Sequence, residues 1–308
     1  MLEGRAEGPY LLFDFRDDRG SPDHAAWLRT QAFPVLGLAQ AGDHNPLVSA
    51  CDVVGSSVDR LSSTIANIER APVAASILVQ ALRATENVPA PDGLVVESLA
   101  YAALQAGPEF ARWRAERPAP IKRSIENGPP LLVAREQDRL SITLNRPDNR
   151  NAISIELRDA LVEAFSFATL DATIGTVDVR ANGACFSVGG DLAEFGQTPN
   201  PAEAHIIRMQ RLPARALMAV AERTQFHLHG ACIGAGVELP AFARRVVARQ
   251  DTFFQLPEIR FGLIPGAGGC ISIPRRIGRQ RTAYLALSAR RISARTALDW
   301  GLIDEITP

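Results

Sequence analysis

Two glutamates in the second half of the chain, Glu238 and Glu258, each lie close to a glycine-rich turn. Glu238 follows the segment Gly234-Ala-Gly236, and Glu258 precedes the segment Pro265-Gly-Ala-Gly-Gly269. Two carboxylates that flank one site can serve as a base and an acid when one is ionised and the other is protonated. The residues after the first turn favour a helix over 236–243, and the N–H groups at a helix N-terminus can stabilise a developing oxyanion.

Each half of this pattern also has an ordinary structural explanation. Gly-x-Gly segments are common, and a glutamate in the first turn of a helix is a favourable partner of the helix dipole. A dinucleotide-binding fingerprint would need a third glycine where Leu239 stands, and the sequence has no Gly-Lys-Ser or Gly-Lys-Thr phosphate loop. The assignment of a site therefore depends on the rest of the chain.

Length and composition limit the classes of protein. The 308 residues suffice for one large domain or two ordinary ones, and 46% are hydrophobic, so a substantial core is expected. The formal net charge of −1 gives no indication of a nucleic-acid partner. Lys122 is the only lysine, which excludes Schiff-base catalysis elsewhere. No signal peptide or membrane-spanning run is recognisable, and the four cysteines lack Cys-x-x-Cys spacing, so we expect a reduced, cytoplasmic protein.

Residues 1–120 are predicted to form an α+β, mainly helical extension. The pattern predicts strands over 10–15, 33–39 and 51–54, a loop over 41–49, a linker over 89–93, and helices beginning near Ser21 and over 58–70, 72–84 and 94–114. Gly107-Pro108 is expected to interrupt or kink the last helix. A boundary rich in proline and charge follows at 116–130. No catalytic constellation precedes it, and Asp52, Glu97 and Glu109 are interpreted as solvated or capping groups.

After this boundary, strands and helices alternate, which predicts an α/β fold with mixed sheets. Strands are expected over 131–133, 140–144, 176–180, 225–228, 245–248, 253–256 and 303–306. Helices are expected over 154–170, 202–221, 236–243, 268–277, 279–287 and 293–299.

Several short segments, in the same order, resemble the crotonase superfamily, the enoyl-CoA hydratase/isomerase family. The main ones are Asn145-Arg-Pro-Asp-Asn-Arg-Asn151, Cys185-Phe-Ser-Val-Gly-Gly190-Asp191, Gly230-Ala-Cys-Ile-Gly-Ala235-Gly-Val-Glu238, Leu256-Pro-Glu258 and Gly262-Leu-Ile-Pro-Gly266. Arg276-Ile-Gly and Ala297-Leu-Asp-Trp-Gly-Leu-Ile303 complete the series. Each segment is weak evidence alone, but together they cover more than half of the chain. The resemblance implies a crotonase-like ββα superhelix over about residues 131–308.

The resemblance also implies roles for particular residues. The backbone amides of Gly190 and Ala235 would bind a thioester oxygen, although glycine is usual at the second position. Glu238 and Glu258 would be the catalytic pair, and Gly266 would help to place the water. The implied CoA and substrate contacts are Asn151, Ala152, Ile153, Asp191 and Leu192. His229 is interpreted as structural, and the candidate phosphate ligands are Arg146, Arg150, Arg275, Arg276, Arg279 and Arg281.

The function implied by the resemblance is addition of water across the 2,3 double bond of an acyl-CoA thioester, through an enolate stabilised by the oxyanion hole. An isomerase, another enolate-based reaction, or a non-catalytic crotonase-fold binding subunit stays open as an alternative. The resemblance further implies a homo-oligomer in fatty acid metabolism, with no metal and no cofactor, because CoA is part of the substrate. No nucleic-acid or membrane partner is expected.

The sequence departs from the family pattern at both ends. Family members usually continue beyond the Trp300-Gly301 segment with a helical tail that covers the acyl pocket, whereas this sequence stops at Pro308. An apolar surface left uncovered there would be unusual for a soluble protein. We therefore expect the helices over 58–70, 72–84 and 94–114 to pack on the core.

Overall fold

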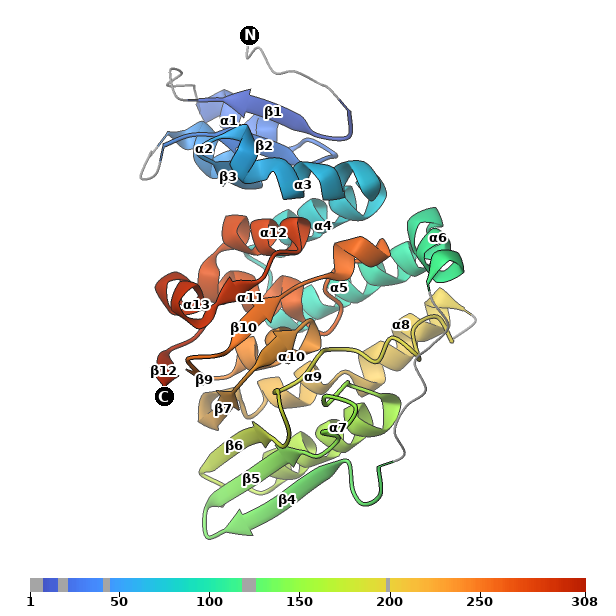
Figure 1. The fold of residues 1–308 in the computed structure, drawn as a ribbon, viewed down its shortest axis with the longest axis vertical. Coiled ribbons are helices and arrows are strands. Elements are labelled where there is room, and N and C mark those ends of the chain that lie inside the picture. Colours follow the sequence, from blue (N-terminus) through green and yellow to red (C-terminus); the bar gives the residue numbers. More distant parts are fainter. Residues whose placement is uncertain (1–7, 16–21, 41–44, 118–125, 198–199) are drawn as a thin grey trace.

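The computed structural model describes residues 8–15, 22–40, 45–117, 126–197 and 200–308. The expected helix start at Ser21 and most of the proposed boundary, including Lys122, lie outside these residues. Figure 1 shows the chain as an elongated molecule, with the first strands at one end and the hairpin of β4 and β5 at the other.

The first strands form a small parallel sheet. β1 (Leu11–Asp14) pairs with β2 (Val35–Leu38), and β2 pairs with β3 (Val53–Gly55). α1 (Pro22–Arg29) and α2 (Pro46–Ala50) complete this unit. The predicted loop over 41–49 is wrong for its second part, because Asn45 caps α2 by accepting a hydrogen bond from the Leu47 amide at 2.9 Å.

Helices then follow in close succession. α3 (Val58–Arg70) and α4 (Pro72–Ala84) have the predicted bounds, and Pro72 occupies the first turn of α4, where its missing N–H costs nothing. The predicted linker over 89–93 is wrong, since α5 (Ala90–Gln105) begins inside it. Gly107 separates α5 from α6 (Pro108–Glu116), which confirms the predicted interruption.

The largest sheet has the strand order β12-β9-β7-β6-β5-β4. β4 and β5 pair antiparallel, and the remaining neighbours pair in parallel. Its strands are β4 (Leu131–Glu136), β5 (Arg139–Leu144), β6 (Thr176–Ala181), β7 (Thr224–Leu228), β9 (Arg245–Arg249) and β12 (Glu305–Thr307). A second sheet, in the order β11-β10-β8, contains β8 (Ala231–Ile233), β10 (Phe253–Gln255) and β11 (Ile292–Ser293). Of these three strands, only β10 was predicted.

The helices of the second half differ from the prediction at two places, and a proline explains each. The helix expected over 202–221 is divided into α8 (Pro201–Arg211) and α9 (Pro213–Met218). The helix expected over 236–243 is reduced to α10 (Ala235–Glu238) and a 3-10 turn that begins at Pro240. The other helices agree with the prediction: α7 (Ile155–Leu170), α11 (Gly269–Ile277), α12 (Arg279–Ser288) and α13 (Ala294–Trp300).

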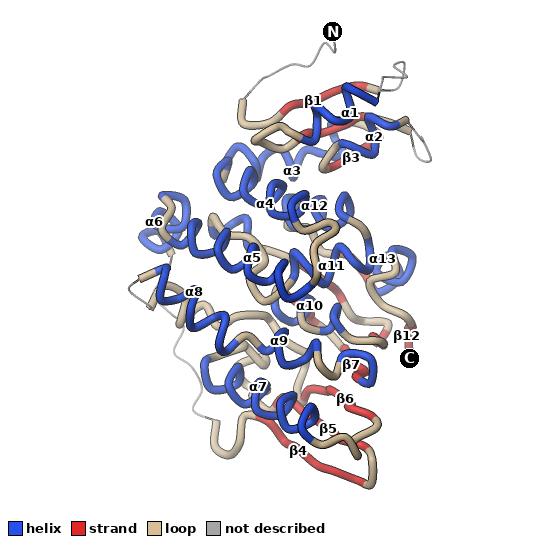
Figure 2. Tube along the Cα trace, turned by 180° about the vertical axis from the view of Figure 1, so that it is seen from behind, coloured by secondary structure: helices blue, strands red, loops and turns tan. Residues whose placement is uncertain are grey.

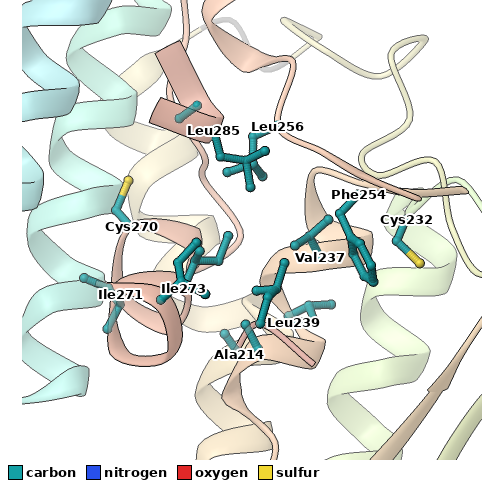
Figure 3. Packing of buried hydrophobic residues seen from close by; sticks show 14 of the residues in the cluster. Ala214, Cys232, Val237, Leu239, Phe254, Leu256, Cys270, Ile271, Ile273 and Leu285 are labelled. Carbon is teal, nitrogen blue, oxygen red and sulfur yellow. The ribbon is translucent and has the colours of Figure 1, made fainter. Parts of the chain in front are cut away.

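One hydrophobic core joins the two halves of the chain. Leu78 and Leu82 of α4 belong to the same buried cluster as Ile271 of α11 and Leu285 of α12. α3 and α4 contact α12, while α5 contacts α11 and α8, and Figure 2 shows α5 running between α8 and α11. Figure 3 shows part of the cluster around Ile271, Ile273 and Leu285. The expected packing of these helices on the core is therefore confirmed.

Asp52 provides a polar link between the small sheet and α12. Its side chain is 1% exposed and accepts hydrogen bonds from the Val35 amide at 2.8 Å, from Arg83 Nε at 2.9 Å and from Arg279 Nη1 at 2.8 Å. The interpretation of Asp52 as a solvated or capping group is therefore wrong, because the carboxylate is buried and neutralises two guanidinium groups. Arg279 is 6% exposed, and its Nη atoms donate to Asp52, Ser49 O and Cys51 O, so the guanidinium lies buried at this junction.

Candidate active site

A cavity of about 260 Å³ brings most of the predicted site residues together. Gly190, Ala235, Glu238, Glu258 and Gly266 all line it, although the sequence distributes them over several elements. α5 and α8 form the opposite part of the wall, where the lining residues include Tyr101, Gln105, Ala204, Ile207, Arg208 and Arg211.

The turn at residues 187–190 and the turn at residues 233–235 lie against each other where the expected oxyanion hole lies. The Ile233 amide donates to Ser187 O at 3.0 Å, and a β-carbon on Gly189 (φ +84°) would lie 2.6 Å from Ile233 O. This close approach requires glycine. Among the described residues, no protein acceptor receives a hydrogen bond from the amide of Gly190 or Ala235. Both amides therefore stay available to a ligand oxygen in the cavity.

Ala235 stands where the family usually has glycine, and its backbone explains why alanine is accepted. Ala235 is not one of the positive-φ residues of the described chain, so its β-carbon causes no strain. The preceding residue, Gly234, carries the unusual conformation with φ +51° and ψ −120°. Because α10 has only four residues, the useful feature of this turn is the Ala235 amide and not the dipole of a long helix.

Gly234 also creates the space between the two predicted catalytic carboxyls. A β-carbon on Gly234 would lie 2.6 Å from Oε1 of Glu258 and 3.8 Å from Oε1 of Glu238. Both Oε1 atoms therefore border the same point in the site. A residue larger than glycine would displace the Glu258 carboxyl.

Glu238 is held by two backbone amides of the turn that begins α11. Its Oε2 accepts hydrogen bonds from the amides of Ala267 at 2.7 Å and Gly269 at 2.9 Å. The residue is 2% exposed, and burial raises its pKa to about 7, against the opposing effect of these two amides. The carboxyl can therefore change protonation state near neutral pH.

Glu258 lies in a less polar setting. Burial is the main cause that raises its pKa well above the usual value, and the charges of Glu238 and Glu97 raise it further. Its buried Oε2 has no hydrogen-bond partner among the described residues. At neutral pH this arrangement favours an ionised Glu238 beside a protonated Glu258, since like charges at one site cannot both form cheaply.

α5 contributes two residues that the sequence analysis did not assign to the site. Tyr101 lines the cavity, and burial raises the pKa of its phenol, so the hydroxyl is neutral and can donate a hydrogen bond. Glu97 is 1% exposed and accepts hydrogen bonds from the amides of Gly268 and Cys270. The predicted capping role of Glu97 is confirmed, but it caps the site turn and is not solvated.

The predicted CoA-contacting residues do not all reach the cavity. Ile153 and Asp191 line it, and Ile153 forms an isolated parallel bridge with Gly190. Asn151 is fully buried, and its side chain binds the Arg146 amide, Asn182 O and Cys185 O. We therefore assign the Asn151 side chain to holding its turn. Ala152 and Leu192 lie outside the cavity lining, with Leu192 44% exposed.

None of the arginines proposed as phosphate ligands lines the cavity, so their contact with a phosphate stays a prediction. Arg279 binds Asp52, Arg146 pairs with Glu156, and Arg276 pairs with Asp304. The arginines on the cavity wall are Arg158, Arg208 and Arg211. His229 Nε2 lies 3.0 Å from Gly183 O, consistent with its predicted structural role.

Comparison with known proteins agrees with this geometry. The family model "Enoyl-CoA hydratase/isomerase" matches residues 135–308, which is more than half of the chain. The chain belongs to the enoyl-CoA hydratase/isomerase family, and its solved structural neighbours have the crotonase fold.

Relatives in this family are named for different activities. The chain is 35% identical to the 2,3-dehydroadipyl-CoA hydratase of Escherichia coli (strain K12), over 58% of this chain and 69% of that protein. It is 32% identical to the enoyl-CoA isomerase/hydratase fer4 of Mycosarcoma maydis, over 54% of this chain and 64% of that protein. A trans-2-decenoyl-[acyl-carrier-protein] isomerase from Streptococcus mutans is 29% identical over 54% of this chain and 65% of that protein.

Solved structures give the same result. The enoyl-CoA hydratase from Thermoplasma volcanium is 30% identical, with a TM-score of 0.54 over 58% of this chain and 72% of that chain. The enoyl-CoA hydratase from Mycobacterium smegmatis is 28% identical, with a TM-score of 0.52 over 58% of this chain and 70% of that chain.

Two further properties concern only the described residues. None of their helices combines the length and apolar character needed to cross a membrane. They also contain no group of three or more histidine, cysteine, aspartate or glutamate side chains arranged to hold a metal ion.

Proposed function

We propose that the chain is an enoyl-CoA hydratase-like lyase that adds water across the 2,3 double bond of an acyl-CoA thioester. The observation that carries this proposal is the pairing of Glu238 and Glu258 at one cavity with the unpaired amides of Gly190 and Ala235. The two amides would bind the thioester oxygen, which acquires charge when the enolate forms.

The different environments of the two carboxyls suggest that one acts as the base and the other as the acid. Glu238, with a pKa of about 7, would take a proton from water as the water attacks the β-carbon. Glu258, whose pKa is held higher by burial and by neighbouring charge, would give its proton to the α-carbon of the enolate. One proton is taken and one is delivered, so the net change is the addition of one water.

An isomerase is the second candidate, because two of the relatives carry that activity in their printed names. Isomerisation needs only a proton removed from one carbon of the acyl chain and returned to another. The ionised Glu238 and protonated Glu258 could support either reaction, and the position of the double bond relative to the thioester would decide between them.

Arg208 indicates which kinds of acyl group the cavity could accept. This guanidinium lines the cavity, lies 4.3 Å from the centre of the Tyr101 ring, and donates hydrogen bonds to the uncharged side chains of Ser98 and Gln105. One relative is named for a CoA ester of a dicarboxylic acid. We therefore propose that acyl groups with a polar or anionic far end belong to the substrate range.

The direct test is a panel of acyl-CoA thioesters. Crotonyl-CoA, longer 2-enoyl-CoA esters and 2,3-dehydroadipyl-CoA would be followed by loss of the absorbance of the conjugated enoyl thioester. A matched 3-enoyl-CoA set would reveal isomerisation by the gain of the same absorbance. Hydration is expected for at least one 2-enoyl ester. Conversion of 3-enoyl esters alone would replace the hydratase proposal with the isomerase.

The remaining expectations from the sequence are kept as proposals. They are a catalytic core over 131–308 with an N-terminal extension over 1–120, a cytoplasmic location, a homo-oligomeric state and a role in fatty acid metabolism without a separate cofactor. Sedimentation of the purified chain at several concentrations would test the oligomeric state.

A further inference from the structure

Two carboxylates, far apart in the sequence, bind the same turn at the start of α11. Glu238 Oε2 accepts the amides of Ala267 and Gly269. Glu97 accepts the amide of Gly268 on Oε1 and that of Cys270 on Oε2, each at 2.7 Å. Four successive amides are thus divided alternately between Glu238 of the predicted catalytic pair and Glu97 of α5.

This arrangement replaces an ordinary helix cap. Most helices begin with serine, threonine, aspartate or asparagine, whose own side chain satisfies a free amide. Here the N-cap residue is Gly268 with φ +104°, which has no side chain to offer. A β-carbon on Gly268 would lie 2.5 Å from the Phe242 ring, so the position cannot supply a cap itself. The amides of the turn therefore depend on Glu97 and Glu238.

The buried position of Glu97 makes this cap costly. Burial and, second, the charge of Glu238 raise its pKa to about 8, against the opposing effect of the two amides. A buried carboxylate is tolerated only when bonds compensate for the loss of water. Glu97 does not line the cavity, so it acts on the reaction only through the groups that do.

We propose that Glu97 is a positioning residue of the active site. It holds the Ala267–Cys270 turn in the conformation in which the amides of Ala267 and Gly269 orient the Glu238 carboxyl in the cavity. This proposal rests on the function proposed above. It also makes α5, which precedes the family-matched residues 135–308, a working component of the site.

The position of α5 is fixed independently of Glu97. Ser98 Oγ lies 2.8 Å from His205 Nδ1, and Arg208 donates to Ser98 Oγ at 3.0 Å and to Gln105 Oε1 at 3.0 Å. α5 also lies close to α11, since a β-carbon on Gly93 would approach Ile271 Cδ1 to 2.7 Å. The loss of one carboxyl should therefore leave the helix in place.

Several charged or titratable groups influence Glu97 or respond to it. They are Glu238 of α10, Glu258 of the 3-10 turn after β10, Arg208 of α8, Cys270 of α11 and Tyr101 on its own helix. The three carboxyls oppose one another's ionisation, while the Arg208 cation favours it. Removing the charge of Glu97 should therefore lower the pH at which the Glu258 carboxyl titrates.

The decisive variant is Glu97→Gln, measured in the full chain. The glutamine oxygen can accept one of the two amides, but its NH₂ group then faces the other N–H. We expect kcat to fall on the order of 10-fold or more with KM nearly unchanged, since Glu97 does not touch the cavity. The alkaline limb of the kcat/KM profile, which reports loss of the Glu258 proton, should move to lower pH.

Glu109→Gln is the matched control. Glu109 of α6 is also buried and also accepts two adjacent amides, from Val73 at 2.8 Å and Ala74 at 2.9 Å, but it does not line the cavity. This variant should lose stability without any change in the pH profile. If Glu97→Gln and Glu109→Gln behaved alike, with neither moving kcat or the pH profile, Glu97 would be purely structural and the proposal wrong.

A second measurement separates this proposal from the proposed function. The ¹³C shifts of the Glu238 and Glu258 carboxyls can be titrated by NMR without any substrate. The Glu258 carboxyl should titrate at lower pH in Glu97→Gln even if every acyl-CoA proved inert, and an unchanged Glu258 titration would overturn the proposal. Should Glu97→Gln fail to fold, Glu97→Asp keeps the charge with a shorter reach. Glu97→Asp should lower kcat while leaving the limb of the kcat/KM profile near its position in the parent protein. A kcat equal to that of the parent would overturn the positioning role.

Discussion

The ring of Tyr101 covers Gly266 so closely that a β-carbon on that glycine would lie 2.4 Å from Cδ2 of the ring. The backbone at Gly266 is not in the positive-φ region, so the neighbouring ring and not the local conformation demands glycine. Tyr101 belongs to α5 and Gly266 to the second glycine turn, so this contact joins the two halves of the chain at the cavity.

Gly266→Ala is therefore expected to cost about 1–3 kcal/mol of stability and to lower activity, because the ring must move. Tyr101→Ala removes the obstacle, although it leaves a cavity of its own. In a double-mutant cycle followed by chemical denaturation, the two changes together should cost less than the sum of the single changes. Strict additivity would show that the ring is not what excludes a side chain at Gly266.

Replacing either cavity glutamate by glutamine should remove most of the turnover. Glu238→Gln and Glu258→Gln keep the size of the side chain but remove the ionisable group, so we expect losses of roughly 10²-fold or more in kcat. Glu163→Gln, on the exposed face of α7, is the control and should retain parental activity. Near-normal rates in both cavity variants would exclude the proposed mechanism, whichever thioester is used.

The stability of the protein should fall as the solution becomes more alkaline. Glu238 and Glu97 have pKa values of about 7 and about 8 in the folded chain, whereas glutamate in an unfolded chain titrates near about 4.3. The folded state therefore binds more protons between these values. The contribution of these two carboxyls to the free energy of unfolding is complete below about pH 4.3 and is lost as the pH rises through about 8.

Urea unfolding at a series of pH values between 5 and 9 checks this expectation. The slope should be smaller in Glu97→Gln, because that variant lacks one of the two groups. An equal slope in parent and variant would show that Glu97 titrates normally. A free energy of unfolding that rose over this range would contradict the raised pKa values altogether.

Arg208→Met should discriminate between substrates. The guanidinium lines the cavity and retains donor groups, and a hydrogen bond between charged groups contributes about 1.5–3 kcal/mol. We expect KM for an acyl group with a terminal carboxylate to rise roughly 10-fold or more, with a smaller change for crotonyl-CoA. Arg215→Met on α9, outside the cavity lining, is the control. Equal losses for both substrates would mean that Arg208 serves only to join α5 and α8.

Asp52→Asn should destabilise the junction between the small sheet and α12. The change would leave the buried Arg83 without its counter-charge and Arg279 with only Glu86, 3.5 Å from its Nε, at a cost of about 3–5 kcal/mol. Glu305→Gln breaks the exposed pair with Arg245 and should cost much less. Similar losses in the two variants would show that the buried pair contributes no more than a surface pair.

Parts of the fold could be predicted because the signal is local. The apolar spacing within 58–70 and the proline at 72 were enough to predict the bounds of α3 and α4. α2 was missed because a five-residue helix, started by Asn45 and Pro46, has the composition of a loop. β8 and β11 were missed for a related reason, since strands of two or three residues are defined by their partners.

The site could be predicted where its residues are adjacent to conformationally special turns. Glu238 and Glu258 were recognisable from the glycines beside them, but the partners of Glu97 lie 171 and 173 residues away. A signal for Glu97 nevertheless exists. Leu94, Tyr101 and Leu104 form a buried helical stripe, and Glu97 stands within it.

The division of the Ala267–Cys270 turn between Glu97 and Glu238 has a consequence for protein engineering. The part of the chain that matches the family could not be transplanted into another scaffold as a self-contained catalytic unit, because two amides of the turn would lose their acceptor. A chimaera that kept residues 131–308 and replaced the first helices would need a new carboxylate at the place of Glu97. Natural exchange of the N-terminal part should meet the same restriction, so the two parts are expected to have diverged together and not by shuffling.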